Sequence, residues 1–262
     1  MNGTVTSQTV GRMSLLTVSP GAGLADVSMG HFSVHSETTS IFAVTSELNA
    51  YAGEPALRRI SRLCEENGIE YSGSTTITST LMGPQRPANI MQLLRECEDA
   101  EDGILYEPRI LRGIGFRDRR SMYALDALEL EHVYLSDPVQ PTYDDQNLVN
   151  DMTVTRDGGS SARYALESGP MSVSQSDGVG RYDASATLNL YQDSQPQYHA
   201  QWKVHLGTVQ GARFPNLRID LLSSNMSVVA SLIKALDIGD RVDITSPPQW
   251  ASYNTIQLLV LG

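Results

Sequence analysis

The strongest constraint on the fold is a hairpin pattern in the second half of the chain. Residues 151–156 alternate in character, so that Met152 and Val154 fall on one face of a strand. Asp157-Gly158-Gly159 then supplies residues suited to a tight turn, and residues 160–166 form the returning strand. The chain is therefore expected to contain antiparallel β-structure.

Further strand candidates follow this hairpin. They are residues 183–191, 213–222, 239–242 and 256–261. Two stretches with helical features interrupt them, around Tyr198–His205 and over 227–236. A succession of strands with one or two small helices predicts a closed or nearly closed β-barrel over residues 149–262.

Helical spacing dominates an earlier part of the chain. One apolar stripe follows Pro55 and consists of Leu57, Ile60, Leu63 and Cys64. A second follows Pro87 and consists of Ile90, Leu93, Leu94 and Cys97. Asn67-Gly68 ends the first helix, residues 75–82 are a strand candidate, and 103–106 with 113–116 form a hairpin. These elements predict a small α+β module over residues 48–124.

Two remaining segments complete the expected organisation. Residues 1–47 contain short strand candidates, and they are expected to be the terminal strands of a β domain. Residues 125–148 are polar and proline-containing, which predicts a linker. The predicted fold class is α+β and mainly β: the end of a β domain, a small two-helix α+β module, and a β-barrel-like domain.

Charge and composition narrow the function classes. The formal net charge is -11, which disfavours binding to a phosphate backbone. The densest basic stretch lies over Arg109–Arg120 and also contains Asp118, so a solvated hairpin with ion pairs is favoured over a nucleic-acid site. Hydrophobic residues make up 40% of the chain, enough for a substantial core.

The two cysteines, Cys64 and Cys97, lie among apolar residues at helical spacing and are expected to be buried thiols. This usage fits folding in a reducing cytoplasm. No apolar run reaches the roughly 20 residues that a membrane-spanning helix needs. The first twelve residues have no apolar signal-peptide core, so a soluble protein without a secretion signal is expected.

The sequence contains no nucleophile elbow, phosphate-binding loop, metalloprotease helix or dinucleotide fingerprint. His31 and His35 share one strand face without a third ligand, and Asp144-Asp145 lacks a third carboxylate at loop-ligand spacing. Acidic clusters stand at helix ends, where solvation is the favoured interpretation; they are Glu65, Glu66, Glu96, Glu98, Asp99, Glu101 and Asp102. We therefore predict no catalytic, cofactor-binding or metal-binding residues, and no enzymatic activity.

Three segments carry a family resemblance. Residues 82–109, 150–164 and 236–245 resemble segments of actinobacteriophage minor tail proteins, and they occur in the order expected for that family. The resemblance covers residue 48 to the end. It implies a virion component at the tail tip, similar to a baseplate or tail hub, made in the host cytoplasm. It also implies a homotrimer around the DNA channel, contacts with other phage tail proteins and a contribution to host attachment.

Residues 1–47 resemble the last strands of a lectin-like or jelly-roll insertion found in many members of that family. If the C-terminal domain surrounds a DNA channel, its lumen is expected to be acidic or neutral, because like charge repels phosphate.

Two other functions remain open. A glycan- or receptor-binding β module needs exposed aromatic side chains in one groove, and the candidates are Tyr182, Tyr191, Tyr198, Trp202 and Trp250. A tail-associated cell-wall hydrolase needs a clustered carboxylate or Cys/His site.

Overall fold

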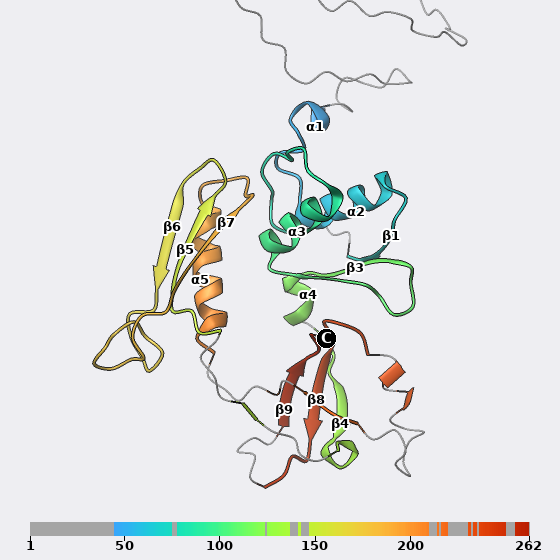
Figure 1. Ribbon diagram of the computed structural model, residues 1–262, viewed down its shortest axis with the longest axis vertical. Helices are drawn as coiled ribbons and strands as arrows, with labels where there is room; N and C mark the ends of the chain where they lie inside the picture. The colour runs from blue at the N-terminus through green and yellow to red at the C-terminus, as the bar shows by residue number, and fades with distance from the viewer. Residues whose placement is uncertain are drawn as a thin grey trace, which may run out of the picture. The chain divides into compact units, whose positions relative to one another are not determined.

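The computed structural model describes residues 45–74, 78–123, 125–136, 141–142, 147–209, 214, 216–219, 230–231, 233–234, 236–249 and 255–261 (Figure 1). All of these belong to one unit, Val44–Gly262. The jelly roll predicted for the first 47 residues lies almost wholly outside the described residues. Half of the strand predicted over 213–222 and half of the helix predicted over 227–236 also lie outside them.

The first sheet has the order β1-β3-β2, with β1 and β3 parallel and β2 and β3 antiparallel. Its strands are β1 Glu70–Gly73, β2 Ile104–Tyr106 and β3 Gly113–Arg117. The hairpin predicted for β2 and β3 is confirmed. A side chain at Gly113 would collide with the backbone carbonyl of Glu70, so this glycine permits the close approach of β1 and β3.

The two predicted helices are confirmed as α2, Ala56–Glu66, and α3, Ile90–Glu101; a single turn, α1, precedes them at Thr45–Leu48. The helix α3 starts later than Pro87, because Asn89 caps it. The Asn89 side chain accepts a hydrogen bond from the Gln92 backbone N–H at 2.9 Å, and Gln92 accepts one from the Asn89 N–H at 3.3 Å.

The strand predicted over residues 75–82 is not part of this sheet in the described residues. There, Leu81 and Met82 make isolated bridges to Pro55 and Leu190. The sheet instead uses β1, which the sequence analysis did not predict, because its four residues Glu-Tyr-Ser-Gly have little apolar alternation.

The second sheet has the order β6-β5-β7 and contains the predicted hairpin. Its strands are β5 Asp151–Arg156, β6 Ser161–Ala165 and β7 Asp183–Leu188, with β5 antiparallel to β6 and parallel to β7. Gly158 takes a φ of +70° in the turn between β5 and β6. Helix α5, Gln195–Gly207, packs on β5 and β6.

The third sheet has the order β4-β8-β9. Its strands are β4 Leu128–Glu131, β8 Arg241–Thr245 and β9 Thr255–Leu259; β4 is parallel to β8, and β8 antiparallel to β9. Helix α4, Arg119–Tyr123, and the 3-10 helix η1, His132–Tyr134, flank β4. The loop expected over 125–148 therefore contains a strand, because Leu130 faces the core between two exposed glutamates.

The barrel prediction is wrong for the part of the chain that the structure describes. Its strands form three separate three-stranded sheets, and in none of them do the first and last strands pair. The physical reason is that α5 covers β5 and β6, and that β8 and β9 pair with the upstream strand β4. Period-two alternation identified strands, but it contained no information on which strands pair.

Two hydrophobic cores stabilise the described helices and sheets. The larger one combines α2, α3 and Phe116 with Met152, Val154, Leu188 and Val204 from the second sheet and α5. The smaller one is built from Leu130, Leu135, Val242, Ile244 and Ile256. Cys64 and Cys97 are buried free thiols, as predicted. None of the helices that the structure describes is long and apolar enough to cross a membrane.

Candidate functional site

A buried cluster of charged side chains surrounds Asp102, directly after α3. Asp102 has a left-handed backbone conformation with a φ of 53°, and its side chain is 9% exposed. Lys203 Nζ on α5 donates a hydrogen bond to its carboxylate. His199 Nδ1 lies 3.3 Å from the same carboxylate and Arg119 NH1 lies 3.7 Å away. Three cationic or potentially cationic side chains therefore converge on one acidic group.

The charged form of Asp102 is stabilised by these neighbours. Burial acts to raise the pKa of the Asp102 carboxyl, but the hydrogen bond from His199 and the charge of Lys203 outweigh it and hold the pKa below its ordinary value. Asp102 consequently stays ionised and joins α3 to α5.

We predict that Asp102→Asn makes the protein less sensitive to acid. A carboxyl whose pKa is lower in the folded state contributes stability above its unfolded pKa of about 3.9 and loses that contribution as pH falls through the folded pKa. The free energy of unfolding, measured with urea from neutral pH down to acid pH, should fall less steeply in the variant. Asp151 and Asp193 also have lowered pKa values, so some slope remains. Parallel curves for variant and wild type would contradict the prediction.

A groove of about 400 Å³ lies beside this cluster, a volume at the low end of the roughly 300–1,000 Å³ typical of ligand pockets. It is bordered by α4, α5, β8 and β9. Its lining residues are Asp102, Arg119, Met122, Tyr123, Trp202, Leu206, Arg241, Gln257, Leu258 and Leu259. The groove therefore combines an apolar and aromatic floor with two arginines.

Trp202 is the central aromatic side chain of the groove. The Tyr123 ring meets it edge to face at 5.4 Å between centroids, and the Arg119 guanidinium lies 5.3 Å from its ring centroid. The indole Nε1 is buried and has no hydrogen-bond partner. Buried indole N–H groups usually have an acceptor, so this one marks an unsatisfied donor beside the groove.

The exposed side of α5 includes apolar as well as polar side chains. On the buried side, Ala200 and Val204 belong to the larger core and His199 lies beside Asp102. On the other side, Leu206 follows Trp202 at a helical four-residue step and is 48% exposed. A helix with apolar residues on both faces normally has neighbours on both faces.

Of the five aromatic residues that the sequence suggested for a binding groove, only Trp202 lines this groove in the described part of the chain. Trp202 lines the groove, whereas Tyr198 is 70% exposed on α5 and the Tyr191 ring lies against Gly53. Tyr182 is half-buried beside β7, and Trp250 lies outside the described residues. Sequence reasoning missed Tyr123 and Leu206; the four-residue spacing of Trp202 and Leu206 in a helix is the signal that could have indicated this surface.

The prediction that the acidic clusters are solvated is wrong for two of their residues. Glu101 is 3% exposed and accepts a hydrogen bond from the Thr80 backbone N–H at 2.7 Å, and Asp102 forms the cluster above. Two other glutamates form local ion pairs, Glu66 with Arg62 and Glu98 with Arg95, and Glu96 accepts a hydrogen bond from the distant Asn189 side chain at 3.1 Å. In the described part of the chain no three acidic, histidine or cysteine side chains form a metal site; His31, His35 and Asp144-Asp145 lie outside it.

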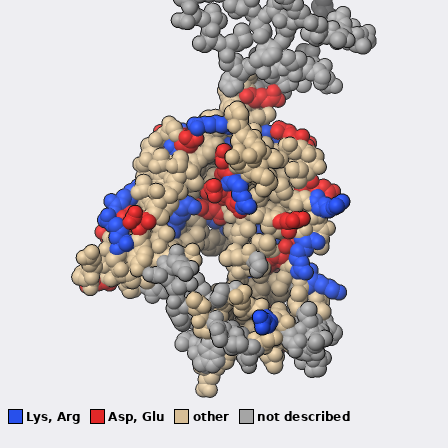
Figure 2. Space-filling model, in the orientation of Figure 1, with Lys and Arg blue, Asp and Glu red and all other residues tan. Residues whose placement is uncertain are grey.

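The basic stretch forms internal contacts. Arg109 donates to the backbone carbonyls of Ile233 and Leu236 at 3.0 and 2.9 Å. Arg117 pairs with Asp240 at 2.7 Å, and Arg119 lies near Asp102. The space-filling view shows acidic and basic side chains interspersed with other residues on the face drawn (Figure 2). Three of the five arginines therefore attach this stretch to neighbouring segments, as in an ion-paired hairpin.

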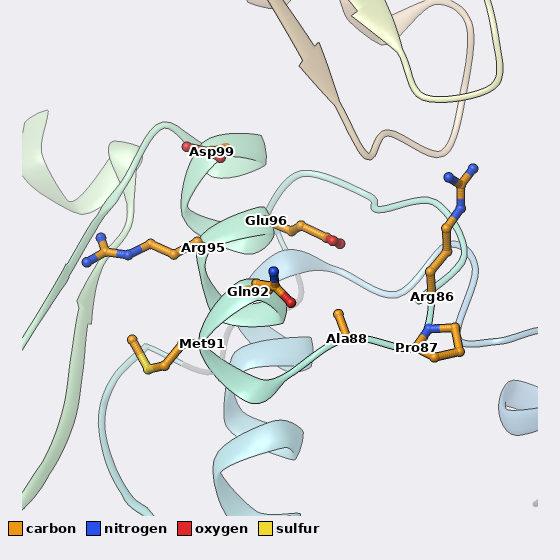
Figure 3. Close-up of a pocket in the computed structure, with 8 residues that line it drawn as sticks. All are labelled: Arg86, Pro87, Ala88, Met91, Gln92, Arg95, Glu96 and Asp99. Atoms are coloured by element: carbon orange, nitrogen blue, oxygen red, sulfur yellow. The ribbon is translucent and has the colours of Figure 1, made fainter.

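A second, more open groove runs along α3 (Figure 3). Pro87, Ala88 and Met91 form its apolar part. Its charged residues have local partners, since Arg86 pairs with Asp157 at 2.9 Å and Arg95 pairs with Glu98. The charged residues of the Trp202 groove also have partners within the chain, since Arg241 pairs with Asp243 at 2.7 Å and Arg119 lies near Asp102. We take the groove at Trp202 as the candidate site because it contains the two aromatic side chains and the unsatisfied indole donor.

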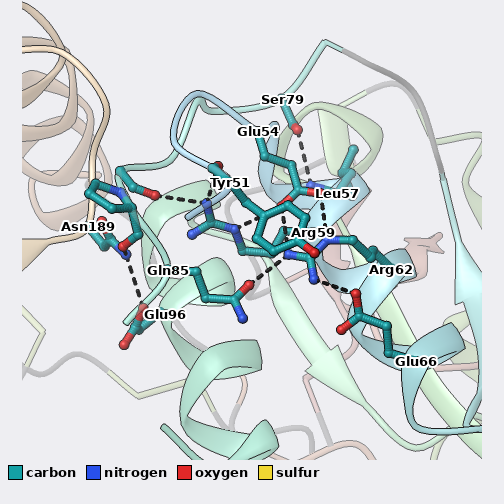
Figure 4. Close-up of polar contacts among 12 residues, drawn as sticks. Tyr51, Glu54, Leu57, Arg59, Arg62, Glu66, Ser79, Gln85, Glu96 and Asn189 are labelled. Atoms are coloured by element: carbon teal, nitrogen blue, oxygen red, sulfur yellow. Dashed lines mark hydrogen bonds and ion pairs between the residues drawn. The ribbon is translucent and has the colours of Figure 1, made fainter. Parts of the chain in front are cut away.

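A third set of polar contacts joins α2 to the loops before and after it (Figure 4). Arg59 is 1% exposed; its Nε donates to Glu54 at 3.1 Å, and its NH2 donates to the carbonyls of Tyr51 and Gly83 at 2.7 and 2.8 Å. Arg62 also pairs with Glu54, at 2.8 Å. This network is internal and therefore structural.

No family model and no curated protein matches the chain. One solved structure, that of the 43 kDa tail protein of prophage MuSo2 from Shewanella oneidensis, is similar with a TM-score of 0.43 and 12% sequence identity. The alignment covers 79% of this chain and 58% of that chain, so this chain spans less than two thirds of that protein's length. At this score the similarity supports no conclusion about activity.

Proposed function

We propose that this chain is a non-enzymatic structural component of a bacteriophage tail that assembles with itself and with other tail proteins at the tail tip. The three segments that resemble minor tail proteins support this proposal, as described above. The hub position, the trimer around the DNA channel and the role in host attachment belong to the same proposal.

The observation that carries the proposal is the combination of small open sheets with exposed apolar side chains on the helices and loops around them. Each described sheet has three strands and two edge strands with no further strand beside them. Among the described residues, several large apolar or aromatic side chains are at least 60% exposed: Ile110, Tyr123, Val133, Tyr198, Val209 and Leu261. Exposed apolar side chains and free strand edges are typical of subunits that are covered in an assembly.

Immunogold electron microscopy of the virion, with antibody raised against this chain, tests the proposal. Gold at the distal tip of the tail is the expected result. Antigen confined to infected-cell lysate and absent from the particle would contradict a structural role in the tail.

A second function is favoured by one feature of the groove. Trp202 and Tyr123 offer aromatic surface beside Arg119, an arrangement that suits an anionic host-surface glycan. Binding on a glycan array that disappears in Trp202→Ala, with the fold retained, would favour this function over a purely structural one.

A further inference from the structure

We propose that the free edge of β9, together with the groove at Trp202, binds an extended, uncharged peptide segment of a partner protein, which adds a strand to the sheet β4-β8-β9. Strand addition obtains affinity from main-chain hydrogen bonds and specificity from pockets that receive alternate side chains. The proposed function makes other tail proteins the partners, so the inference rests on it for the source of the segment.

The strand β9 lies at one edge of its sheet (Figure 1), and its main-chain groups face β8 and the free edge in turn. The Val260 N–H donates to the Asp240 carbonyl at 2.9 Å. Two residues earlier in the same register, the main-chain groups of Leu258 therefore also face β8. Those of Gln257 and Leu259 point to the free edge, where they have no hydrogen-bond partner in the described chain.

The sequence of β9 lacks the features that protect an exposed edge. Natural edge strands are often kept from further pairing by charged side chains or proline. The five residues Thr-Ile-Gln-Leu-Leu include neither. At the other edge of this sheet, β4 carries the exposed Glu129 and Glu131, and the edge strand β6 of the second sheet carries the exposed Arg163. Of these three edges, β9 is therefore the one suited to a further strand.

The groove adjoins this strand. Its lining includes Gln257 and Leu259 of β9 together with Trp202 and Leu206 of α5. Because Leu258 packs against the smaller core, the side chains of Gln257 and Leu259 lie on the opposite face of the sheet. Alternate side chains of an added strand lie on that same face, in position to enter the groove.

The charged lining residues select against a charged side chain in the segment. Arg241 pairs with Asp243 at 2.7 Å. Arg119 and Lys203 both face Asp102. A charged side chain that entered the groove would lose water without gaining a free counter-ion. An apolar side chain loses nothing by this exchange, because the rest of the lining is apolar and aromatic.

The Trp202 indole supplies a hydrogen-bond donor for the segment. Its Nε1 is buried and has no partner in the described chain, although buried polar groups are normally hydrogen-bonded. An extended peptide presents a main-chain carbonyl at every residue, which is the acceptor that this donor lacks. The segment thus completes the hydrogen bonds of both the β9 edge and the indole.

Fluorescence anisotropy of a labelled short peptide in which threonine and leucine alternate, titrated with the full chain, tests the inference. This peptide should bind roughly tenfold or more tightly than peptides with aspartate or lysine in place of leucine. Methylation of one alternate set of its amide nitrogens should weaken binding by a similar factor, and methylation of the other set, which faces away from β9, should not. Absence of binding, or equal binding of all these peptides, overturns the inference.

Gln257→Pro tests the strand edge. The proline removes an N–H that points away from β8, so the pairing of β8 and β9 is retained, and peptide binding should weaken by roughly tenfold. Ala165→Pro is the matched control. The Leu166 N–H donates to the Asn150 carbonyl, so the Ala165 N–H points to the free edge of β6, and its loss should leave peptide binding unchanged. Circular dichroism of both variants checks that the fold is retained.

Two further substitutions test the groove and leave the main chain intact. Trp202→Phe removes the indole donor and keeps an aromatic ring, and it should weaken peptide binding by about fivefold. Leu206→Ser should weaken it by a similar factor. Tyr198→Ser, at a position that is 70% exposed on the same helix and outside the groove, is the control. Binding that neither groove variant weakens would contradict the proposed site.

Other occupants of the groove give different results. A glycan needs no strand edge, so glycan binding that survives Gln257→Pro, in a chain that binds no peptide, overturns the inference. Self-association of the wild type in analytical ultracentrifugation, lost in Gln257→Pro and again without peptide binding, would show that a second copy covers the edge, and would also overturn it.

Failure of this inference is distinguishable from failure of the proposed function. Gold label at the tail tip, with a protein that binds none of the peptides, would retain the tail assignment and reject the peptide site. Peptide binding that follows the edge and groove variants, in a protein absent from the virion, would retain the site and reject tail proteins as its partners.

Discussion

Replacement of Arg59 by alanine is expected to lower the free energy of unfolding by about 3 kcal/mol, the low end of the range for breaking a buried ion pair. The change removes the donors to the carbonyls of Tyr51 and Gly83, which join the two loops beside α2 (Figure 4). It also leaves a cavity at a position that is 1% exposed. The loss stays near the low end because Arg62 still pairs with Glu54.

Urea unfolding followed by circular dichroism measures this effect. Arg58→Ala on the same helix is the matched control, because Arg58 is exposed; it should change stability by less than about 0.5 kcal/mol. Arg59→Met separates the two causes, since it retains most of the volume and removes the charge. An alanine variant as stable as the Arg58 control would show that the buried network contributes nothing to stability.

Phe116→Ala is expected to lower the free energy of unfolding by about 3–5 kcal/mol. Phe116 is 2% exposed and lies on β3, the central strand of its sheet, within the larger core. A side chain at Gly103 would collide with the Phe116 ring, which shows how closely the ring fills this space. Its removal leaves a cavity in the larger core and weakens the packing of β1 and β2, the two strands that pair with β3.

Ile110→Ala is the control for this second prediction. Ile110 lies between β2 and β3 and is 94% exposed, so its truncation should change the stability of the isolated chain by less than about 0.5 kcal/mol. Thermal and urea unfolding of both variants make the comparison. Equal stability of Phe116→Ala and wild type would mean that β3 is not part of the folded core.

The local elements were largely predictable from sequence. The stripes of α2 and α3 are buried as their spacing indicated, since Leu57, Ile60, Leu94 and Cys97 are each at most 1% exposed. The hairpin of β5 and β6 turns at Asp157-Gly158-Gly159 because only a few residue types favour that backbone. The strand β4 was not predicted, because four residues of alternating Leu and Glu between polar segments are too short a pattern.

The candidate site was not predictable in the same way. Asp102, Arg119 and Trp202 are far apart in the sequence, and their cluster exists because α3 and α5 pack on a common core. The sequence predicted solvent exposure for all acidic residues at the end of α3. No local sequence feature distinguishes Asp102, which is buried, from Asp99, which is exposed.

The sequence by itself determined the positions of the main helices, the central hairpin, the buried cysteines and the acidic charge. These follow from short-range periodicity, turn chemistry and composition. Only the tertiary structure decided that the strands form three open sheets in place of a barrel, and that β4 joins β8 and β9. The physical reason is that pairing between distant strands depends on which faces can be buried together, and no local pattern records that choice.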